Sequence, residues 1–449
     1  MTDNANPQEL LDYDLDRIRG YRELIDFYHG RHWEGSPRFG EKRLTLNYAR
    51  VFIDKITSYV MSGMSLAVEP RENTVEAKSK ARRAEEALRQ VYEANNLAQL
   101  DFETETDCSV LGDACFKVVW DSRAKSVRVT APDVQGIYAW WQGDDISKVW
   151  RVASRYVLSA EEAVALYQVR PRGKTASLTE FWTDTDFELY LDNDPIEKKT
   201  NPYGFIPFII FPNLREPKRF WGISDLPQLR EVQRELNRAI SQLARILELS
   251  GNPIAVLENV ESAEDIAVKP GAVWNVPESA RAYLLDLLQG GGVKLHIDYI
   301  ELLYRALHDI SESPRAAFGG MSRDLSGVAL EIELQPLIQK IQRKRLIRTA
   351  VYNRRNNLIL RLLQQFKNED FGEVSLRTIW SPVLPRDVAR VVASEQALVQ
   401  SGIHSRRHAM DELGISDAES EFQRWLEERE AILKMNKKLE ARSSRSESE

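Results

Sequence analysis

The sequence predicts an α+β fold in which a strand-rich region is flanked by helices. Between residues 115 and 210, aromatic and β-branched residues alternate in short runs separated by Asp, Gly, Asn and Pro turns, as is typical of antiparallel strands. Apolar residues recur at helical spacing before residue 111 and after residue 223. One of these helical patterns, residues 328–367, is far longer than the usual globular helix of about 11 to 12 residues.

The composition is that of a soluble globular protein with two or three domains. The chain has 449 residues, of which 43% are hydrophobic and 29% are charged, with a formal net charge of −7. No stretch approaches 18 consecutive apolar residues, and the N-terminus lacks the features of a secretory signal, so we expect a cytoplasmic origin and no membrane span. Cys108 and Cys115 fit no zinc or redox spacing and are expected to be reduced, partly buried thiols.

The first half of the chain should contain four N-terminal helices and a mostly antiparallel body. Helices are expected over residues 7–28, 47–61, 75–95, 97–110 and, within the body, 159–167. Strands are expected over residues 115–120, 126–130, 136–140, 148–153, 178–183, 187–191 and 205–210.

Two amphipathic helices are expected on either side of a short β-containing insert, and they would run antiparallel. The first begins after Ser224 or Asp225 as N-cap. The first helix carries a basic stripe, and the returning helix carries a mainly acidic face. These charges form either an ion-pair seam within one subunit or contacts between neighbouring subunits, and exposed pairs contribute only about 0 to 1 kcal/mol each. The basic residues are Arg230, Arg234, Arg238 and Arg245, and the acidic ones include Asp298, Glu301 and Asp309.

The charges of the long helix between residues 340 and 367 are all positive. A solvated face normally mixes both signs, so this pattern favours an acidic surface or a polyanion nearby. Pro336 lacks the backbone donor that a mid-helix residue needs, and the apolar phase changes after Ile341. We therefore expect a bend between Gln335 and Arg345. The cations are Lys340, Arg343, Lys344, Arg345, Arg348, Arg354, Arg355, Arg361 and Lys367.

The C-terminal part is expected to be a strand followed by helices. The strand spans residues 373–380, two helices span residues 387–400 and 416–437 with a short helix between them, and the polar residues after 436 are expected to be disordered.

A search for catalytic chemistry is negative. Gly173-Lys-Thr175 resembles the end of a phosphate-binding loop, but Gln168 stands where the first glycine is required. His404 and His408 have helical i, i+4 spacing without the glutamate of a metalloprotease motif. We therefore predict a non-enzyme with no catalytic residues, no metal site and no cofactor.

The order of elements resembles the portal proteins of tailed bacteriophages, in particular the portal (connector) family of siphoviruses. The similarity covers nearly the whole chain, and its weight comes from the order of elements rather than from any one motif. The stretches that carry it are Tyr28-His-Gly-Arg-His-Trp33, Leu46-Asn-Tyr-Ala-Arg-Val-Phe-Ile-Asp-Lys-Ile56, Phe211-Pro-Asn213, Trp221-Gly-Ile-Ser-Asp225 and Ser326-Gly-Val-Ala-Leu330.

The resemblance implies a portal fold with an α/β wing, a two-helix stem, a small β-containing clip, a long kinked helix above a tunnel loop, and a C-terminal helical crown. The resemblance implies a wing over residues 1–223, with the N-terminal helices and the antiparallel β region, and a wing return strand over 368–385. The stem would consist of a descending helix over 224–250 and an ascending helix over 293–312, with the clip between them over 251–292. The tunnel loop would span 313–327, the long basic tunnel helix 328–367, the crown helices 386–436 and a disordered tail 437–449.

The resemblance also implies a homo-oligomeric ring, typically of twelve subunits, at one capsid vertex of the virion, assembled in the host cytoplasm. Double-stranded DNA would pass through it without sequence-specific contact during packaging and ejection. Its protein partners would be the terminase large subunit, a head-tail adaptor, and the major capsid and scaffolding proteins, with no membrane involved.

Three groups of residues are candidates for these contacts. The DNA-channel candidates on the tunnel loop and basic helix are Arg315, Phe318, Met321, Arg323, Lys340, Arg343 and Lys344. The stem charges given above are candidates for contacts between subunits. The candidates for terminase and adaptor docking on the clip are Glu261, Glu264, Asp265 and Trp274.

Two other hypotheses fit parts of the sequence. One is a nucleic-acid-processing enzyme whose basic helix holds the substrate, which would need a metal-binding or phosphate-binding site. The other is a non-portal helical scaffold whose stem-like helices form an intramolecular coiled coil, and its mass in solution would be that of a monomer or dimer.

Overall fold

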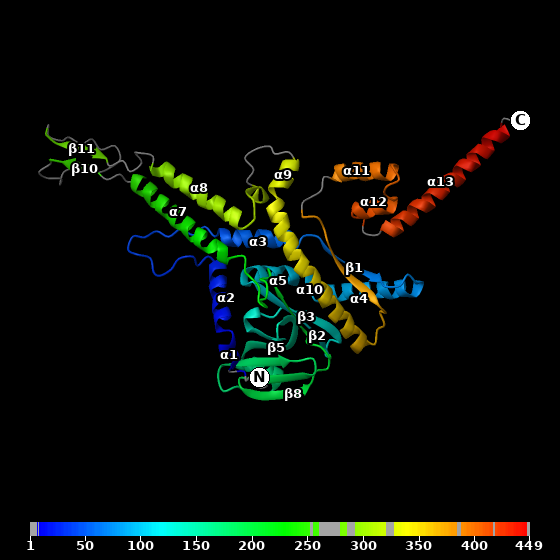
Figure 1. Ribbon diagram of the computed structural model, residues 1–449, viewed down its shortest axis with the longest axis horizontal. Helices are drawn as coiled ribbons and strands as arrows, with labels where there is room; N and C mark the ends of the chain where they lie inside the picture. Colours follow the sequence, from blue (N-terminus) through cyan, green and yellow to red (C-terminus); the bar gives the residue numbers. More distant parts are fainter. Residues whose placement is uncertain are drawn as a thin grey trace. The chain divides into compact units, whose positions relative to one another are not determined.

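The computed structural model describes Pro7 and residues 9–251, 255–259, 279–284, 292–319, 327–383, 388–415 and 418–446 (Figure 1). The chain forms two compact units, Met1–Ser381 and Pro382–Glu449. Helices and strands both contribute to the first unit, so the predicted α+β class is confirmed.

The N-terminal helices lie close to their predicted positions. Asn47 and Thr74 cap two of them by accepting hydrogen bonds from the backbone N–H groups of Arg50 and Ala77. The helices are α1 Glu9–Tyr13, α2 Leu15–Tyr28, α3 Tyr48–Val60, α4 Val75–Ala94 and α5 Leu97–Leu111.

Two antiparallel sheets form the body, as the alternating pattern predicted. One is three-stranded in the order β3-β2-β9, and the other is five-stranded in the order β4-β5-β6-β7-β8. The short helix α6, Ala160–Tyr167, interrupts the second sheet and starts with a capping box between Ser159 and Glu162. The strands are β2 Asp113–Asp121, β3 Ser126–Thr130, β4 Ile137–Gln142, β5 Asp145–Ser159, β6 Thr175–Trp182, β7 Asp186–Leu191, β8 Asp194–Thr200 and β9 Phe208–Pro212.

One strand pairing joins distant parts of the chain. β1, Met64–Pro70, pairs antiparallel with β12, Val374–Trp380, with Met64 opposite Trp380 and Pro70 opposite Val374. The sequence predicted β12 but not β1, and it also missed β8. β8 carries Pro195 and three consecutive charges beginning at Glu197, which are atypical of strands.

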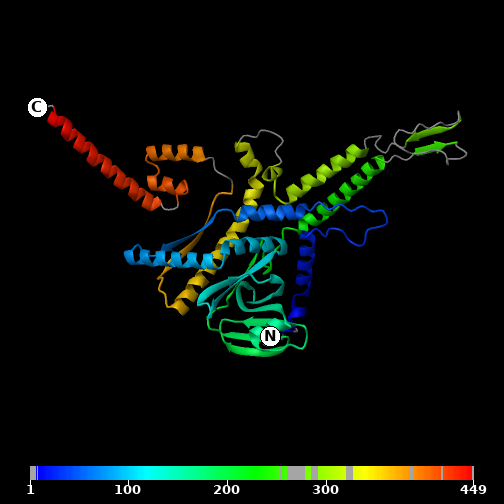
Figure 2. The same ribbon diagram turned by 180° about the vertical axis from the view of Figure 1, so that it is seen from behind.

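Two long helices lie side by side and run in opposite directions, with a small hairpin between them in the sequence (Figures 1 and 2). They are α7, Arg230–Gly251, and α8, Gly292–Ile310, and the hairpin pairs β10, Ala255–Glu258, with β11, Arg281–Leu284. Leu229, Leu236 and Leu307 pack with Phe52 of α3 at their base. The antiparallel arrangement that the sequence predicted is therefore present.

The start of the first of these helices was predicted incorrectly. A 3₁₀ turn, Pro227–Leu229, precedes α7, so neither Ser224 nor Asp225 is its N-cap. Ser224 instead donates to the carbonyl of Val110 at 2.6 Å, and Asp225 is buried in ion pairs.

The long basic helix is interrupted one residue before the predicted interval. α9, Gly327–Glu333, ends before Leu334, and α10 then runs without a break from Gln335 to Lys367. Pro336 lies in the first turn of α10. Backbone N–H groups in the first turn have no acceptor within the helix, so the missing N–H of proline costs no helical hydrogen bond there. The interruption therefore lies at Leu334, just before the interval 335–345 in which a bend was expected, and Pro336 begins a helix there instead of breaking one.

The main core lies between α10, α4 and the three-stranded sheet. Phe116 of β2 packs with Tyr352 of α10, and Leu88 and Ile359 belong to the same cluster. Both cysteines are free and buried, as predicted.

The second unit consists of three helices among the described residues. They are α11 Val388–Gln400, α12 Arg406–Glu412 and α13 Ala418–Ser446. The tail expected to be disordered from residue 437 is helical as far as Ser446. Residues 437–442 are mostly good helix formers, which extend a preceding helix readily.

A tight joint connects α2, β2 and the segment before α7. Asp113 is 1% exposed and accepts hydrogen bonds from the Tyr21 hydroxyl at 2.6 Å and from the Gly222 backbone N–H at 2.7 Å. A Cβ atom at Gly222 would come within 2.3 Å of the Gly112 carbonyl oxygen and 2.9 Å of the Pro212 Cα. Only glycine fits at position 222 without moving one of these backbones.

Gly222→Ala is expected to lower the free energy of unfolding by about 1 to 3 kcal/mol, because backbone on two sides must shift. Gly20→Ala is the matched control, since Gly20 lies inside α2 and a Cβ atom added there would have no neighbour within 4 Å. That control should stabilise the chain by roughly 0.5 to 1 kcal/mol. Thermal unfolding of both variants tests the pair, and equal effects would contradict the close approach.

Asp113 should make stability decrease with rising pH. Burial raises the pKa of Asp113 from 3.8 to about 6, against the opposing hydrogen bonds from Tyr21 and Gly222. Between these two pKa values the folded chain holds a proton that the unfolded chain has released. The stability that Asp113 contributes is therefore fully present below pH 3.8 and is lost as the pH rises through about 6.

Asp113→Asn removes the titrating group and is expected to gain stability relative to wild type between pH 4 and pH 8, by at most about 3 kcal/mol. Urea unfolding at the two pH values measures the gain. Asp121→Asn is the control of opposite sign, because hydrogen bonds from the backbones of Ala124 and Arg123 lower the pKa of Asp121. A pH-independent difference for Asp113→Asn would contradict the argument.

Candidate functional site

The cations of α10 fall into a buried and an exposed set. The buried set is at most 7% exposed, which is unusual for charged side chains. The exposed set includes Arg343, Arg361 and Lys367. The buried cations are Lys340, Lys344, Arg345, Arg348 and Arg355.

Lys344 and Lys340 share one buried carboxylate, that of Asp225. The Lys344 ammonium lies 2.6 Å from Asp225 Oδ2, and the Lys340 ammonium lies 3.1 Å from Asp225 Oδ1. Lys344 also donates to Ser109 Oγ at 2.9 Å and Asn213 Oδ1 at 2.7 Å, so all three of its donors are used. Burial alone would raise the pKa of Asp225, but Lys340 and Lys344 outweigh it and hold the pKa well below its usual range.

Arg348 and Arg355 continue this network toward the other end of α10. Arg348 binds Glu105 with two parallel bonds, Nε to Oε2 at 2.6 Å and Nη2 to Oε1 at 3.0 Å. Its Nη1 donates to the carbonyls of Pro212 and Asn213, each at 2.9 Å. Arg355 pairs with Asp101, which is fully buried. Four cations therefore meet three carboxylates, and α5 supplies two of the three.

Arg345 uses carbonyl groups instead of a carboxylate. Its guanidinium donates to the backbone oxygens of Tyr59, Val60 and Ser62, at the C-terminal end of α3, at distances of 2.9 to 3.0 Å. A further bond of 2.7 Å reaches the carbonyl of Ser381, after β12. The last carbonyls of a helix have no partner within it, so a buried arginine satisfies them. Arg345 thus joins α3 and the end of β12 to α10.

The structure corrects two of the proposed DNA-channel residues. Lys340 and Lys344 are 1% and 0% exposed and are paired inside the subunit, so neither can contact a phosphate in this conformation. The acidic surface that the all-positive helix required belongs to its own chain. Arg343 is half-exposed, and its Nη2 donates to both carboxylate oxygens of Glu312, with both distances 2.7 Å.

The candidates that follow α8 have different environments. Arg315 is exposed, with its guanidinium 5.2 Å from the Tyr304 ring centre. Phe318 is half-buried, and its ring centre lies 5.1 Å from Phe52 and 5.2 Å from His308. Phe318 therefore anchors this segment to α3 and α8. Met321 and Arg323 lie outside the described residues.

The arginines of α7 pair with the N-terminal part of the chain rather than with α8. Arg230 lies 3.3 Å from Glu23 of α2, and Arg234 lies 2.9 Å from Glu34 in the loop after α2. Arg238 pairs within α7, with Glu235 at 3.5 Å, and Glu301 pairs within α8, with Arg305 at 2.6 Å. In the described ranges there is no ion pair between the two stripes, so the intramolecular seam between α7 and α8 is absent. Arg245, Asp298, Glu301 and Asp309 are exposed.

A polar seam on α7, which the sequence analysis missed, holds the chain that precedes α3. Gln233, Asn237 and Ser241 are buried at i, i+4 and i+8. Their side chains accept hydrogen bonds from the backbone N–H groups of Ala49, Leu46 and Leu44, at 2.9 to 3.1 Å. The signal was visible in the spacing, since three uncharged polar residues follow one another at one-turn intervals beside the apolar face of the helix.

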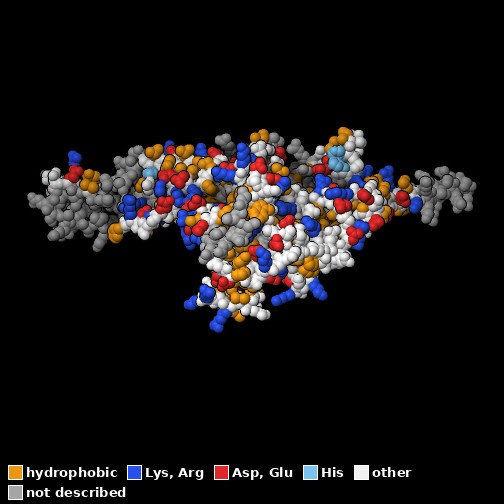
Figure 3. Space-filling view, turned by 60° about the horizontal axis from the view of Figure 1, so that its bottom comes forward, with side chains coloured by type: hydrophobic (Ala, Val, Ile, Leu, Met, Phe, Trp, Pro, Cys, Tyr) orange, Lys and Arg blue, Asp and Glu red, His pale blue; other side chains and the backbone are white. Residues whose placement is uncertain are grey.

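A surface pocket of about 650 Å³ opens between α7 and the loop that joins α2 to α3. Six of its lining residues are Lys or Arg and two are Glu, in a chain whose net charge is negative. Elsewhere the charges are mixed: on the face in Figure 3, blue and red side chains are interspersed over the described surface. The pocket is therefore a local concentration of positive charge. Its cations are Arg38, Lys42, Arg43, Arg234, Arg238 and Arg245.

The structure does not describe the part of the clip that carries the docking candidates. The four candidates outside the described residues are Glu261, Glu264, Asp265 and Trp274. Within the described ranges, no three or more His, Cys, Asp or Glu side chains are grouped to hold a metal ion. No helix of the described part is both long and apolar enough to cross a membrane.

Most of the chain matches a known protein family. The family model for phage portal protein, SPP1 Gp6-like, matches residues 8–435. This span includes every element from α1 to α12 and most of α13. No curated protein matches the chain.

Lys344→Met should lower the free energy of unfolding by about 3 to 5 kcal/mol, because it breaks the buried ion pair with Asp225 Oδ2 and leaves Lys340 as the one cation on that carboxylate in the described residues. Arg343→Met removes an exposed pair one residue away and should cost less than about 1 kcal/mol. Urea unfolding of both variants in the same assembly state measures the difference. A Lys344→Met variant as stable as Arg343→Met would show that Lys340 alone neutralises Asp225.

Proposed function

The chain belongs to the phage portal protein family, and we propose that its copies close into a ring, typically of twelve subunits, through which double-stranded DNA is packaged and ejected. The observation that carries the proposal is the family match over residues 8–435. Portal proteins are structural and non-enzymatic components of the virion capsid. We further propose that the ring docks the terminase large subunit, then a head-tail adaptor, and contacts major capsid and scaffolding proteins.

The elements can be assigned to portal regions on this proposal. The α7–α8 pair would be the stem, and the β10–β11 hairpin between them would belong to the clip. The segment after α8 would begin the tunnel loop. The N-terminal helices, both antiparallel sheets and the β1–β12 pair would form the wing, and the second unit would form the crown.

The distribution of charge supports passive passage of DNA. A twelve-membered ring would carry a formal charge of roughly −84 (12 × −7), which disfavours general binding to DNA. Most cations of α10 are neutralised internally, so exposed cations such as Arg315 would provide local phosphate contacts. Contacts to phosphates position a duplex without reading its sequence.

Light scattering and negative-stain images of the purified chain test the proposal. We expect a particle near ten or more times the 51.6 kDa chain mass, roughly 620 kDa for twelve copies, with a central opening. A stable monomer or dimer under all assembly conditions would contradict it and would favour the helical scaffold. Metal-dependent cleavage of nucleic acid would favour the enzyme.

A further inference from the structure

The loop between α2 and α3 projects from the body as an arm, defined here as residues 33–43. Phe39 near its tip is fully exposed, which is costly for a large apolar side chain. The chain on its C-terminal side is fixed by the polar seam of α7, and Lys42 lies 3.5 Å from Glu248 farther along that helix. The contacts with α7 therefore fix the arm at its C-terminal side, and the arm exposes Phe39 to solvent.

The pocket beside the arm has cations available for a partner. Arg43 is engaged by Glu41 and the carbonyl of Gly35, and Arg234 is engaged by Glu34. Arg245, in contrast, is exposed and forms no ion pair within the described residues. The surface thus combines an apolar tip with unsatisfied positive charge, and it suits a partner that is both acidic and apolar.

The solvent-facing side of α8 has this complementary character. Leu295 and Leu302 are 71% and 61% exposed, two helical turns apart, so they form an apolar stripe. Asp298 and Glu301 lie between them in the sequence and are exposed. Asp298 has no ion-pair partner in the described part of the chain. Exposed leucines in a stripe beside acidic residues are typical of an interaction surface.

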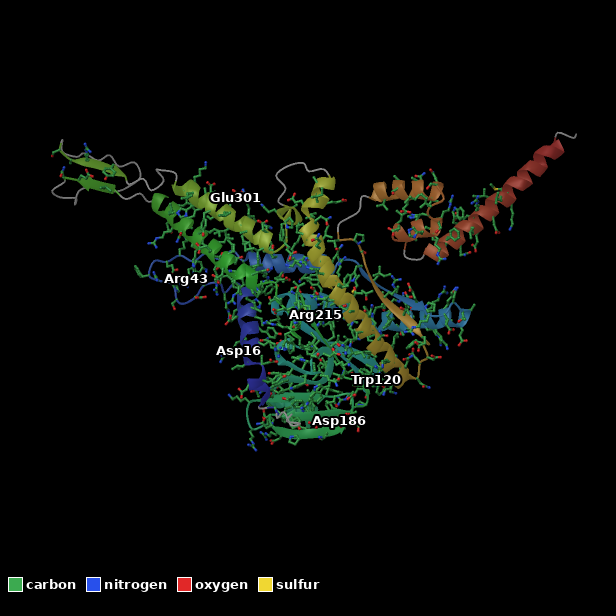
Figure 4. The ribbon with its side chains drawn as sticks, in the orientation of Figure 1. Asp16, Arg43, Trp120, Asp186, Arg215 and Glu301 are labelled. Atoms are coloured by element: carbon green, nitrogen blue, oxygen red, sulfur yellow. The ribbon has the colours of Figure 1, made fainter. Side chains whose placement is uncertain are left out.

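The two surfaces lie on opposite sides of α7. Figures 1 and 2 show the arm on one side of this helix and α8 on the other, and Figure 4 shows Arg43 and Glu301 separated in this way. They cannot meet within one subunit without unfolding the α7–α8 pair. Two different complementary patches on one chain produce a head-to-tail contact, which closes into a ring when the rotation allows it.

We propose that the arm and the basic pocket on α7 receive the outer face of α8 from a second copy of this chain. Phe39 and Trp33 would cover the Leu295–Leu302 stripe, and Arg38 and Arg245 would face Asp298. Lys42 and Glu301 would exchange their exposed pairs with Glu248 and Arg305 for a pair with each other. This inference rests on the proposed ring. A protein partner fits better than DNA, because a duplex keeps its bases stacked and offers phosphates but no apolar surface for Phe39.

Photo-crosslinking identifies what the arm touches. Phe39→p-benzoylphenylalanine keeps an aromatic side chain at the tip, and crosslinks are mapped by mass spectrometry in rings mixed from isotopically light and heavy chains. We expect light-heavy crosslinks to residues 295–305. Crosslinks to another element, to the same chain only, or to added DNA would overturn the proposal. The same probe at Val75, which is 87% exposed on α4, controls for unspecific reaction and should not label α8.

Charge reversal tests the electrostatic part. Arg38→Glu with Lys42→Glu should reduce the assembled fraction at low salt at least tenfold, and adding Asp298→Lys with Glu301→Lys should restore it to within twofold of wild type. Arg172→Glu with Lys174→Glu makes the same change in net charge at an exposed turn and should leave assembly within twofold of wild type.

The outcomes separate this inference from the proposed function. Rings that form normally with the reversed arm, and whose crosslinks avoid α8, would overturn the inference while the portal function stands. A wild-type chain that never assembles would overturn both.

Discussion

Neutralisation of the buried cations on α10 is the constraint on which the rest of the first unit depends. Lys340, Lys344, Arg348 and Arg355 cannot remain buried unless carboxylates accompany them, because an unpaired charge inside a protein is costly. Those carboxylates come from α5 and from Asp225, and Asn213 adds its amide oxygen. The helix therefore fixes where α5, the end of β9 and the start of α7 lie relative to one another.

If the chain forms the proposed DNA passage, the same network determines how many cations of the basic helix could contact phosphates. A row of free cations along a channel would bind phosphates strongly and in a salt-dependent way, which slows sliding. Here the positive charge is used to hold the subunit together. Buried ion pairs contribute little net stability compared with apolar packing, but breaking one is strongly destabilising, so they favour one arrangement of the elements. A frame in which most cations of the long helix are paired inside the subunit would suit a passage that carries DNA without holding it.

Much of the fold was predictable because its signals are local. The α3 cap at Asn47, the α6 capping box at Ser159 and the alternating strands of the body all depend on residues within one turn or one strand. The family was predictable from the order of such elements. The pairing of α10 was not, because Lys344 and Glu105 are more than two hundred residues apart and sequence gives no distance between them. The charges along one helix predicted an acidic surface or a polyanion nearby, but they could not say that the acidic residues belong to the same chain.

The missed polar seam has a consequence for assembly. A surface loop normally gains freedom as it lengthens, and an interface built on a mobile loop must order it at an entropic cost. Gln233, Asn237 and Ser241 remove that freedom in the free subunit by binding the backbone of residues 44–49. The same helix packs against α8 on its other side. α7 therefore fixes the geometry between the arm and the outer face of α8, and this geometry would set the rotation from one subunit to the next.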